Sequence, residues 1–152
     1  MRFAMQVADD PVSRAMLSLF DVTPSTAYVE ITEHELLIRE GNLFHESFLL
    51  QDLGRAGLDN WNWLMGLGLH TDFQGTVAPI TSPEKVIGIP VATPRSLFLR
   101  LAGPLGFQVD CNRLVMSLAE PDSFLVAFNA SLAKTTDSLE EQEEEFQQYS
   151  AD

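Results

Sequence analysis

The stretch RLVMSLAEPDSFLVAFNASLA, residues 113–133, decides the fold of this chain. It opens with a strand pattern, because Leu114, Met116 and Leu118 share one face of an extended segment. After a break, Pro121 stands where the first residue of a helix belongs, since that position needs no backbone N–H. The sequence therefore predicts a strand that leads directly into a helix.

The predicted helix has one strongly apolar face. Asp122 places a negative charge in its first turn, where the helix dipole favours it. Phe124, Phe128 and Leu132 recur every four residues, with Leu125 beside them, so their side chains line up and need a surface to cover. We expect these two elements to end a domain, with the helix closing one side of a sheet or barrel.

The composition is that of one soluble globular domain. The 152 residues are 45% hydrophobic and 20% charged, which allows a real core. The formal net charge is −13, of which residues 134–152 carry −6 and the remaining 133 residues carry −7. So acidic a chain argues against nucleic acid and anionic membranes as partners, because both are bound through Lys and Arg.

Nothing in the sequence indicates an oxidising compartment or a membrane segment. Cys111 is the single cysteine, so no disulfide can form within the chain. The first ten residues lack the apolar stretch of a secretion signal, and no apolar run is long enough to span a bilayer. We expect a cytoplasmic protein.

Residues 1–25 predict an N-terminal extension made of a short strand and a helix. Asp10 is the expected N-cap and Pro11 the first helical residue. Five apolar residues are expected to pack this helix against the main domain, namely Val12, Ala15, Met16, Leu19 and Phe20.

From residue 26 onward, short strand patterns alternate with turns. The predicted strands are residues 28–31, 36–39, 43–50, 66–70, 76–80, 86–89 and 114–118. Residues 51–65 are irregular, and residues 92–112 suit either a short helix or an extended segment. This spacing is typical of a barrel or sandwich, so we expect a mainly β (α+β) domain over residues 26–133.

The order of a strand meander, a second set of strands and a closing helix resembles the pleckstrin-homology-like (PH-like) barrel. Three stretches are also similar to a group of bacterial proteins with that fold and no assigned activity: LLIREG at 36–41, GLGLHTD at 66–72 and RLVMSLAEPDSF at 113–124. The resemblance implies a barrel of about seven antiparallel strands capped by the C-terminal helix.

The same resemblance bears on phosphoinositides. PH domains that bind these headgroups use Lys and Arg around their first loops, whereas the corresponding turns here carry Glu33, Glu35 and Glu40. This departure argues against headgroup binding on charge grounds.

No motif predicts catalysis, a cofactor or a metal site. His70 and Asp72 come nearest to an acid/base pair, at the end of a predicted strand, and turn chemistry explains them equally well. Gly66 and Gly68 lack the third glycine of a dinucleotide loop. Cys111 lies beside a carboxylate, which would raise the pKa of its thiol rather than lower it.

The best candidate for a functional surface is the loop with Trp61 and Trp63, followed by Leu64 and Met65. In an extended segment both rings project to the same side, and exposed tryptophans are typical of binding hot spots. The alternative is that the two rings fold inward and plug the mouth of the barrel.

Residues 134–152 form an acidic tail. Its composition favours disorder or a frayed helix, because so few apolar residues cannot repay the entropy of ordering. The alternative is an extension of the closing helix, since Glu and Gln are good helix formers. The Glu140–Glu145 run would suit mimicry of nucleic acid or recruitment of a basic partner, although such runs are usually a solvated face.

We therefore expect a non-catalytic module that acts through protein contacts, including self-association, without cofactor or metal. The rival hypothesis is a small α+β barrel whose internal pocket holds an apolar small molecule or runs simple acid/base chemistry with His70 or Asp72. A roomy pocket with convergent polar groups would favour the rival. A barrel filled by side chains would favour the module.

Overall fold

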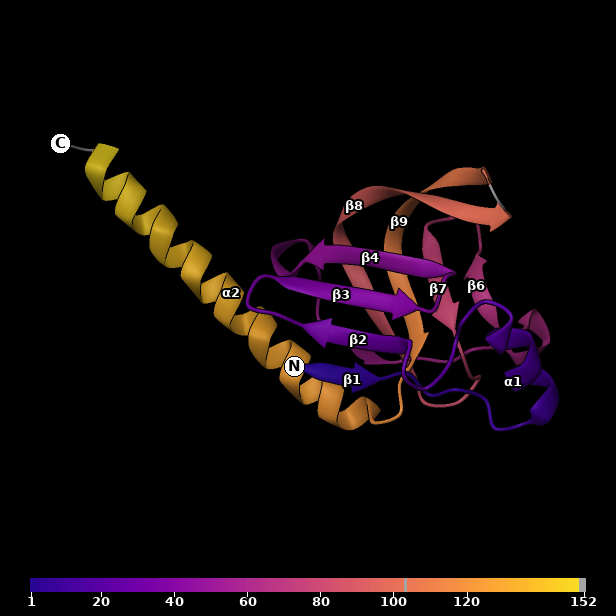
Figure 1. The fold of residues 1–152 in the computed structure, drawn as a ribbon. Coiled ribbons are helices and arrows are strands. Elements are labelled where there is room, and N and C mark those ends of the chain that lie inside the picture. The colour runs from indigo at the N-terminus through magenta and orange to yellow at the C-terminus, as the bar shows by residue number, and fades with distance from the viewer. Residues whose placement is uncertain (103, 151–152) are drawn as a thin grey trace.

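The first strand patterns of the chain form a four-stranded antiparallel sheet (Figure 1). The computed structural model describes residues 1–102 and 104–150. The sheet contains, in spatial order, β1 (Arg2–Ala4), β2 (Ala27–Ile31), β3 (Glu35–Glu40) and β4 (Phe44–Leu49). On β2 the side chains of Ala27, Val29 and Ile31 are buried and those between them are half-buried, as the predicted alternation requires. Since β1 pairs with β2, the N-terminal extension contributes a strand to the main body.

A second sheet has five strands and lies behind the first in Figure 1. Its spatial order is β5 (Gly57–Leu58), β8 (Val86–Ala102), β9 (Leu105–Ser117), β7 (Thr76–Ile80) and β6 (Gly68–Thr71). Of residues 92–112, which the sequence left undecided, residues 92–102 and 105–112 are extended and form most of the long β8–β9 hairpin. Buried residues alternate there with exposed ones, as at Leu97, Leu99, Val109 and Cys111, and this period of two explains the strand.

The prediction of about seven antiparallel strands in a barrel holds only at a coarser level, that of an α+β fold with a C-terminal helix. The described residues form nine strands, and β7 runs parallel to β9. They form two sheets rather than a closed barrel. Two isolated bridges lie outside these ladders: Met5, directly after β1, pairs with Leu118, directly after β9, and Leu53, shortly after β4, pairs with Val91 of β8.

Helix α1 (Pro11–Ser18) begins as predicted. The Asp10 side chain caps it by accepting a hydrogen bond from the Ser13 amide at 2.8 Å. The prediction of its packing face was wrong: Leu17 is its buried residue, whereas the apolar residues predicted to pack are exposed. The helix has apolar residues on two sides. The five predicted residues recur every three or four positions and form the larger apolar face, so the pattern did not indicate that Leu17, on the other side, is the residue that packs on the body.

Helix α2 (Pro121–Ser150) starts at the predicted proline and covers one side of the body. Phe124 and Phe128 are buried and stacked at 5.4 Å between ring centroids, and Phe3 of β1 meets Phe124 edge-on at 5.3 Å. The helix continues through the acidic tail to Ser150, where disorder or fraying was expected, and projects well beyond the sheets (Figure 1). The helix propensity of Glu and Gln accounts for this extension.

The main core lies between the sheets and beneath the first turns of α2. It is filled by apolar side chains such as Ile38, Phe48, Ile89, Leu114 and Met116. Two 3₁₀ turns, η1 (Leu50–Asp52) and η2 (Trp63–Met65), interrupt the irregular segment between β4 and β6. Among the described residues, no helix combines the length and apolarity needed to cross a membrane.

Candidate functional site

The two tryptophans of the 61–65 loop occupy different environments. Trp61 is half-buried and packs against the small apolar cluster that contains Ala78 and Val115. Its ring nitrogen Nε1 donates a hydrogen bond to the carbonyl of Gly66 at 2.9 Å, and its ring lies 5.5 Å from the His70 ring. Trp61 therefore holds the loop against the second sheet.

Trp63, Leu64 and Met65 point into solvent, with 71%, 71% and 51% of their surfaces exposed. They form η2, whose first turn is capped by the Asn62 side chain accepting from the Leu64 amide at 3.0 Å. Because the chain turns at η2 instead of remaining extended, the two tryptophans do not project to one side as a pair. The turn is held at both ends. The Asn62 cap fixes its start, and the carbonyl of Gly66, which follows Met65, accepts the hydrogen bond from the Trp61 ring.

Helix α1 contributes further exposed apolar side chains at the same end of the molecule. We call the combined feature the α1–η2 surface: Met16, Phe20 and Trp63 line a common groove, and Val12, Leu19, Leu64 and Met65 are the exposed apolar residues near them in the chain. The α1 members recur at helical spacing and so lie along one face of the helix or just past its end. None of the seven side chains is charged. The sequence did not reveal the α1 part of this surface, because its apolar residues were expected to pack against the main domain.

A groove of about 390 Å³ joins the two halves of this surface. Met16 of α1 and Phe20 just past its end line one side, and Trp63 of η2 lines another. Leu67, directly before β6, and Leu69 of β6 complete the apolar lining. Among its described lining residues, Ser13 and Trp63 alone carry polar side-chain groups. Strand β6 is the border strand of the five-stranded sheet, so the groove runs beside a sheet edge.

Contacts with the β3–β4 turn fix the C-terminal end of α1. The Asn42 amide donates to the Phe20 carbonyl at 2.8 Å. Gly41 has φ of +50°, and a Cβ atom there would lie 2.5 Å from the Asp21 carbonyl oxygen. Only glycine allows this close approach. The apolar face of α1 is therefore presented from a fixed position.

His70 and Asp72, the predicted alternative pair, each bond to neighbouring backbone groups, and no hydrogen bond or ion pair joins the two side chains among the described residues. His70 uses Nε2 in a contact of 2.9 Å with the Leu67 carbonyl. Asp72 accepts from the amides of Gln74 and Thr76 at 2.8 and 3.0 Å. Slight burial acts to raise the pKa of Asp72, but these hydrogen bonds outweigh it and lower the pKa overall. Both residues serve local turn structure.

Other chemical candidates have structural explanations. Cys111 is buried in the core, and burial raises the pKa of its thiol to about 11, so it stays protonated at neutral pH. Across the part of the chain that the structure describes, no three His, Cys, Asp or Glu side chains are grouped as metal ligands. What the described residues do bring together is an uncharged apolar surface with a groove.

Comparisons with known proteins identify no relative of this chain. No protein-family model, no curated protein and no solved structure matches it.

Proposed function

We propose that this protein is a non-catalytic protein-interaction module that associates with a second copy of itself through the α1–η2 surface. The observation that carries the proposal is the exposure of Trp63, Leu64 and Met65 on a turn that Trp61 holds in place. A rigid, exposed aromatic beside a groove is the usual composition of an interface hot spot, because little entropy is lost when it docks.

Charge favours this surface over the other faces of the molecule as the place where two copies meet. The chain carries a net charge of −13, so two copies repel each other over most approaches. The α1–η2 surface has no charged member, and burying it against the same surface of a second copy removes apolar area from water without pairing like charges. In a two-fold dimer the same surface of each copy faces the other. The exposed side chains of η2 on one copy could therefore enter the groove of the second copy, and the reverse.

We also propose that the architecture belongs to the PH-like class. Support comes from the meander β2–β3–β4, from the bridges Met5↔Leu118 and Leu53↔Val91 between the sheets, and from the closing helix α2. In this class the barrel commonly serves as a scaffold for contacts made by its surface. The filled core between the sheets fits that role better than it fits an internal ligand site.

Light scattering over a range of protein concentrations tests the proposal. The full chain should reach twice the monomer mass, and the double variant Trp63→Ala/Leu64→Ala should remain a monomer with an unchanged circular dichroism spectrum. Val126→Ala is the matched control, because Val126 is 74% exposed but lies on α2, away from this surface. A full chain that stays monomeric, or a double variant that still associates, would refute self-association here.

The groove supports a second candidate function, binding of an apolar small molecule. Its volume of about 390 Å³ lies within the range of ligand pockets, and its lining is almost wholly apolar. This function predicts a monomer whose melting temperature rises with medium-chain alkanols and no longer rises in Met16→Trp, which fills the groove. A dimer that is indifferent to these compounds would favour the interaction module instead.

A further inference from the structure

The outer half of α2, residues 135–150, has a stripe that contains Leu139, Phe146 and Tyr149, and the last two of these side chains are largely exposed. The helix has 30 residues and is therefore about 45 Å long, at about 1.5 Å per residue. Its first turns are fixed by the buried rings of Phe124 and Phe128 and by the Asn129 side chain, which bonds both backbone groups of Ala56. Beyond them the helix extends away from the sheets (Figure 1).

The stripe follows a heptad pattern. Alternating steps of three and four residues connect Leu125, Phe128, Leu132, Thr135, Leu139, Gln142, Phe146 and Tyr149. The first three of these side chains pack on the core. At the far end Phe146 and Tyr149 are 73% and 91% exposed, although they continue the same seam. A seam of this period is what one helix offers to another.

A crevice beside the seam has room for about one turn of a second helix, given a helix diameter of about 10–12 Å and a pitch of about 5.4 Å. Its volume is about 620 Å³, and Thr135, Leu139 and Gln142 of the seam line one wall. The opposite wall includes Glu33 and His34 from the turn between β2 and β3. An incoming helix that follows the seam would thus contact the body at its inner end and α2 alone at its outer end.

Charge determines which helix fits. Residues 134–150 contain Lys134 against six carboxylates, a net charge of −5. Three pairs of like charge stand four residues apart, which destabilises an isolated helix: Asp137–Glu141, Glu140–Glu144 and Glu141–Glu145. The last turn has no basic residue to offset the helix dipole. If two copies of this helix paired, a net charge of −5 on one would face −5 on the other. A basic helix would instead offset the repulsion between the carboxylates.

We propose that the outer half of α2 binds an amphipathic helix of a partner protein, one with apolar residues at the seam and Lys or Arg on both flanks. Leu139, Phe146 and Tyr149 supply the apolar contacts. Glu143 and Glu145 occupy the positions on either side of the seam and pair with the basic flanks. This surface is separate from the α1–η2 surface, so either one can fail while the other stands.

The test uses the full chain and a labelled peptide of about three heptads, with Leu at the seam positions and Lys at the flanking positions. Fluorescence anisotropy should show saturable one-to-one binding that weakens as salt is added. Phe146→Ala/Tyr149→Ala should weaken binding about tenfold or more, because it removes two aromatic anchors. Glu143→Gln/Glu145→Gln keeps helix propensity and should weaken binding about threefold at low salt. Gln147→Ala/Gln148→Ala, which lies off the seam, is the matched control.

Two further peptides decide between mechanisms. A peptide of the same composition, with its leucines moved off the seam, should bind at least about tenfold more weakly. A peptide with Glu in place of Lys should not bind. Equal binding of the rearranged peptide would mean that the charge attraction between the acidic helix and the lysines explains the binding without the seam, and this would overturn the proposal. Equal binding of the Glu peptide, or no binding of the Lys peptide, would overturn it as well.

Discussion

Glu40 is an ionisable residue in an apolar, fully buried environment. It is completely buried, and within the described residues neither carboxylate oxygen has a hydrogen-bond partner. Burial raises the pKa of Glu40 from 4.5 to about 8. Glu40 was expected in a turn, yet its parity with Leu36 and Ile38 on β3 was a signal that it faces inward.

The stability of the protein should therefore decrease as the pH rises from about 4.5 to about 8. In this window the unfolded chain ionises Glu40 while the folded protein keeps it protonated, so the free energy of unfolding falls. Glu40→Gln is a neutral isostere of the protonated acid and should be more stable than the parent by about 3 kcal/mol at pH 7. Urea unfolding at several pH values measures the difference.

The exposed carboxylate Glu84 provides the control for this experiment, and Glu84→Gln should follow the pH profile of the parent chain. Parallel profiles for the parent and Glu40→Gln would show that the Glu40 carboxyl is not held neutral in the folded protein.

At the scale of elements, the side-chain amide of Asn129 helps to align α2 with the body. Asn129 Nδ2 donates to the Ala56 carbonyl at 3.1 Å, and Asn129 Oδ1 accepts from the Ala56 amide at 3.0 Å. Both partners are backbone groups of a buried residue, so they have few alternatives. The seam of α2 and its crevice take their position from this contact and from the two phenylalanines before it.

Asn129→Ala should lower the free energy of unfolding by about 1–3 kcal/mol, because it leaves both backbone groups of Ala56 without partners. Chemical denaturation measures this loss. Ser138→Ala, on the exposed part of the same helix, should change stability by less than about 0.5 kcal/mol. Equal effects of the two substitutions would mean that the Asn129 contact contributes nothing specific.

Elements were predictable where the apolar period was unambiguous. The alternation in β2 and β3 and the Pro121 start of α2 follow directly from the residue pattern. The face of α1 did not, because two of its sides carry apolar residues and local spacing cannot say which one meets the body. Residues 92–112 were undecided because consecutive apolar residues near Leu97 fit either period until β9 supplies a partner strand.

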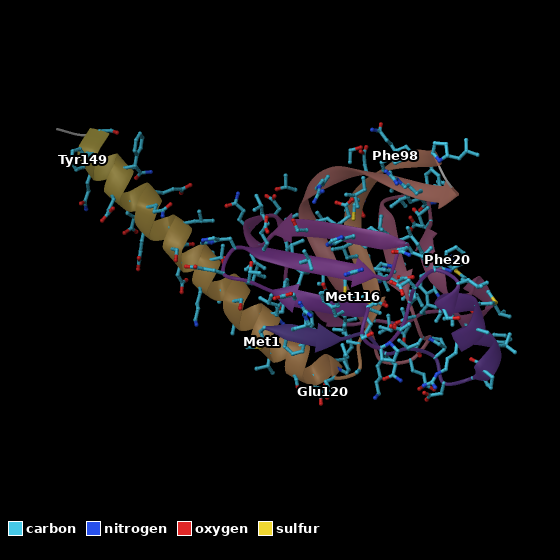
Figure 2. All side chains as sticks on the ribbon, in the orientation of Figure 1. Met1, Phe20, Phe98, Met116, Glu120 and Tyr149 are labelled. Carbon is cyan, nitrogen blue, oxygen red and sulfur yellow. The ribbon has the colours of Figure 1, made fainter. Side chains whose placement is uncertain are left out.

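At the scale of the whole molecule, the two proposed surfaces lie far apart. Phe20 marks the α1–η2 end in Figure 2, and Tyr149 marks the tip of α2 at the opposite end. Local patterns predicted the η2 residues and the acidic run, but long-range contacts set their arrangement. Met16, Phe20 and Trp63 line one groove, although more than forty residues separate the two segments in the chain, and no sequence period encodes that proximity.

A chain truncated after Ala133 should keep the fold and the self-association of the full chain. The outer half of α2 contributes few buried residues and carries internal charge repulsion, so the free energy of unfolding should change by less than about 1 kcal/mol. Thermal unfolding and light scattering check both expectations. Loss of association on truncation would place the self-association surface on the acidic helix instead.

The most direct test of the central claim is quenching of tryptophan fluorescence by acrylamide across a dilution series. The chain has two tryptophans, and Trp63→Phe isolates the half-buried Trp61 as the reference. Association through the α1–η2 surface predicts that the Trp63 contribution becomes protected and shifts to shorter wavelength as the protein concentration rises. If Trp63 stays fully quenchable at concentrations where light scattering detects a dimer, the α1–η2 surface is not the interface.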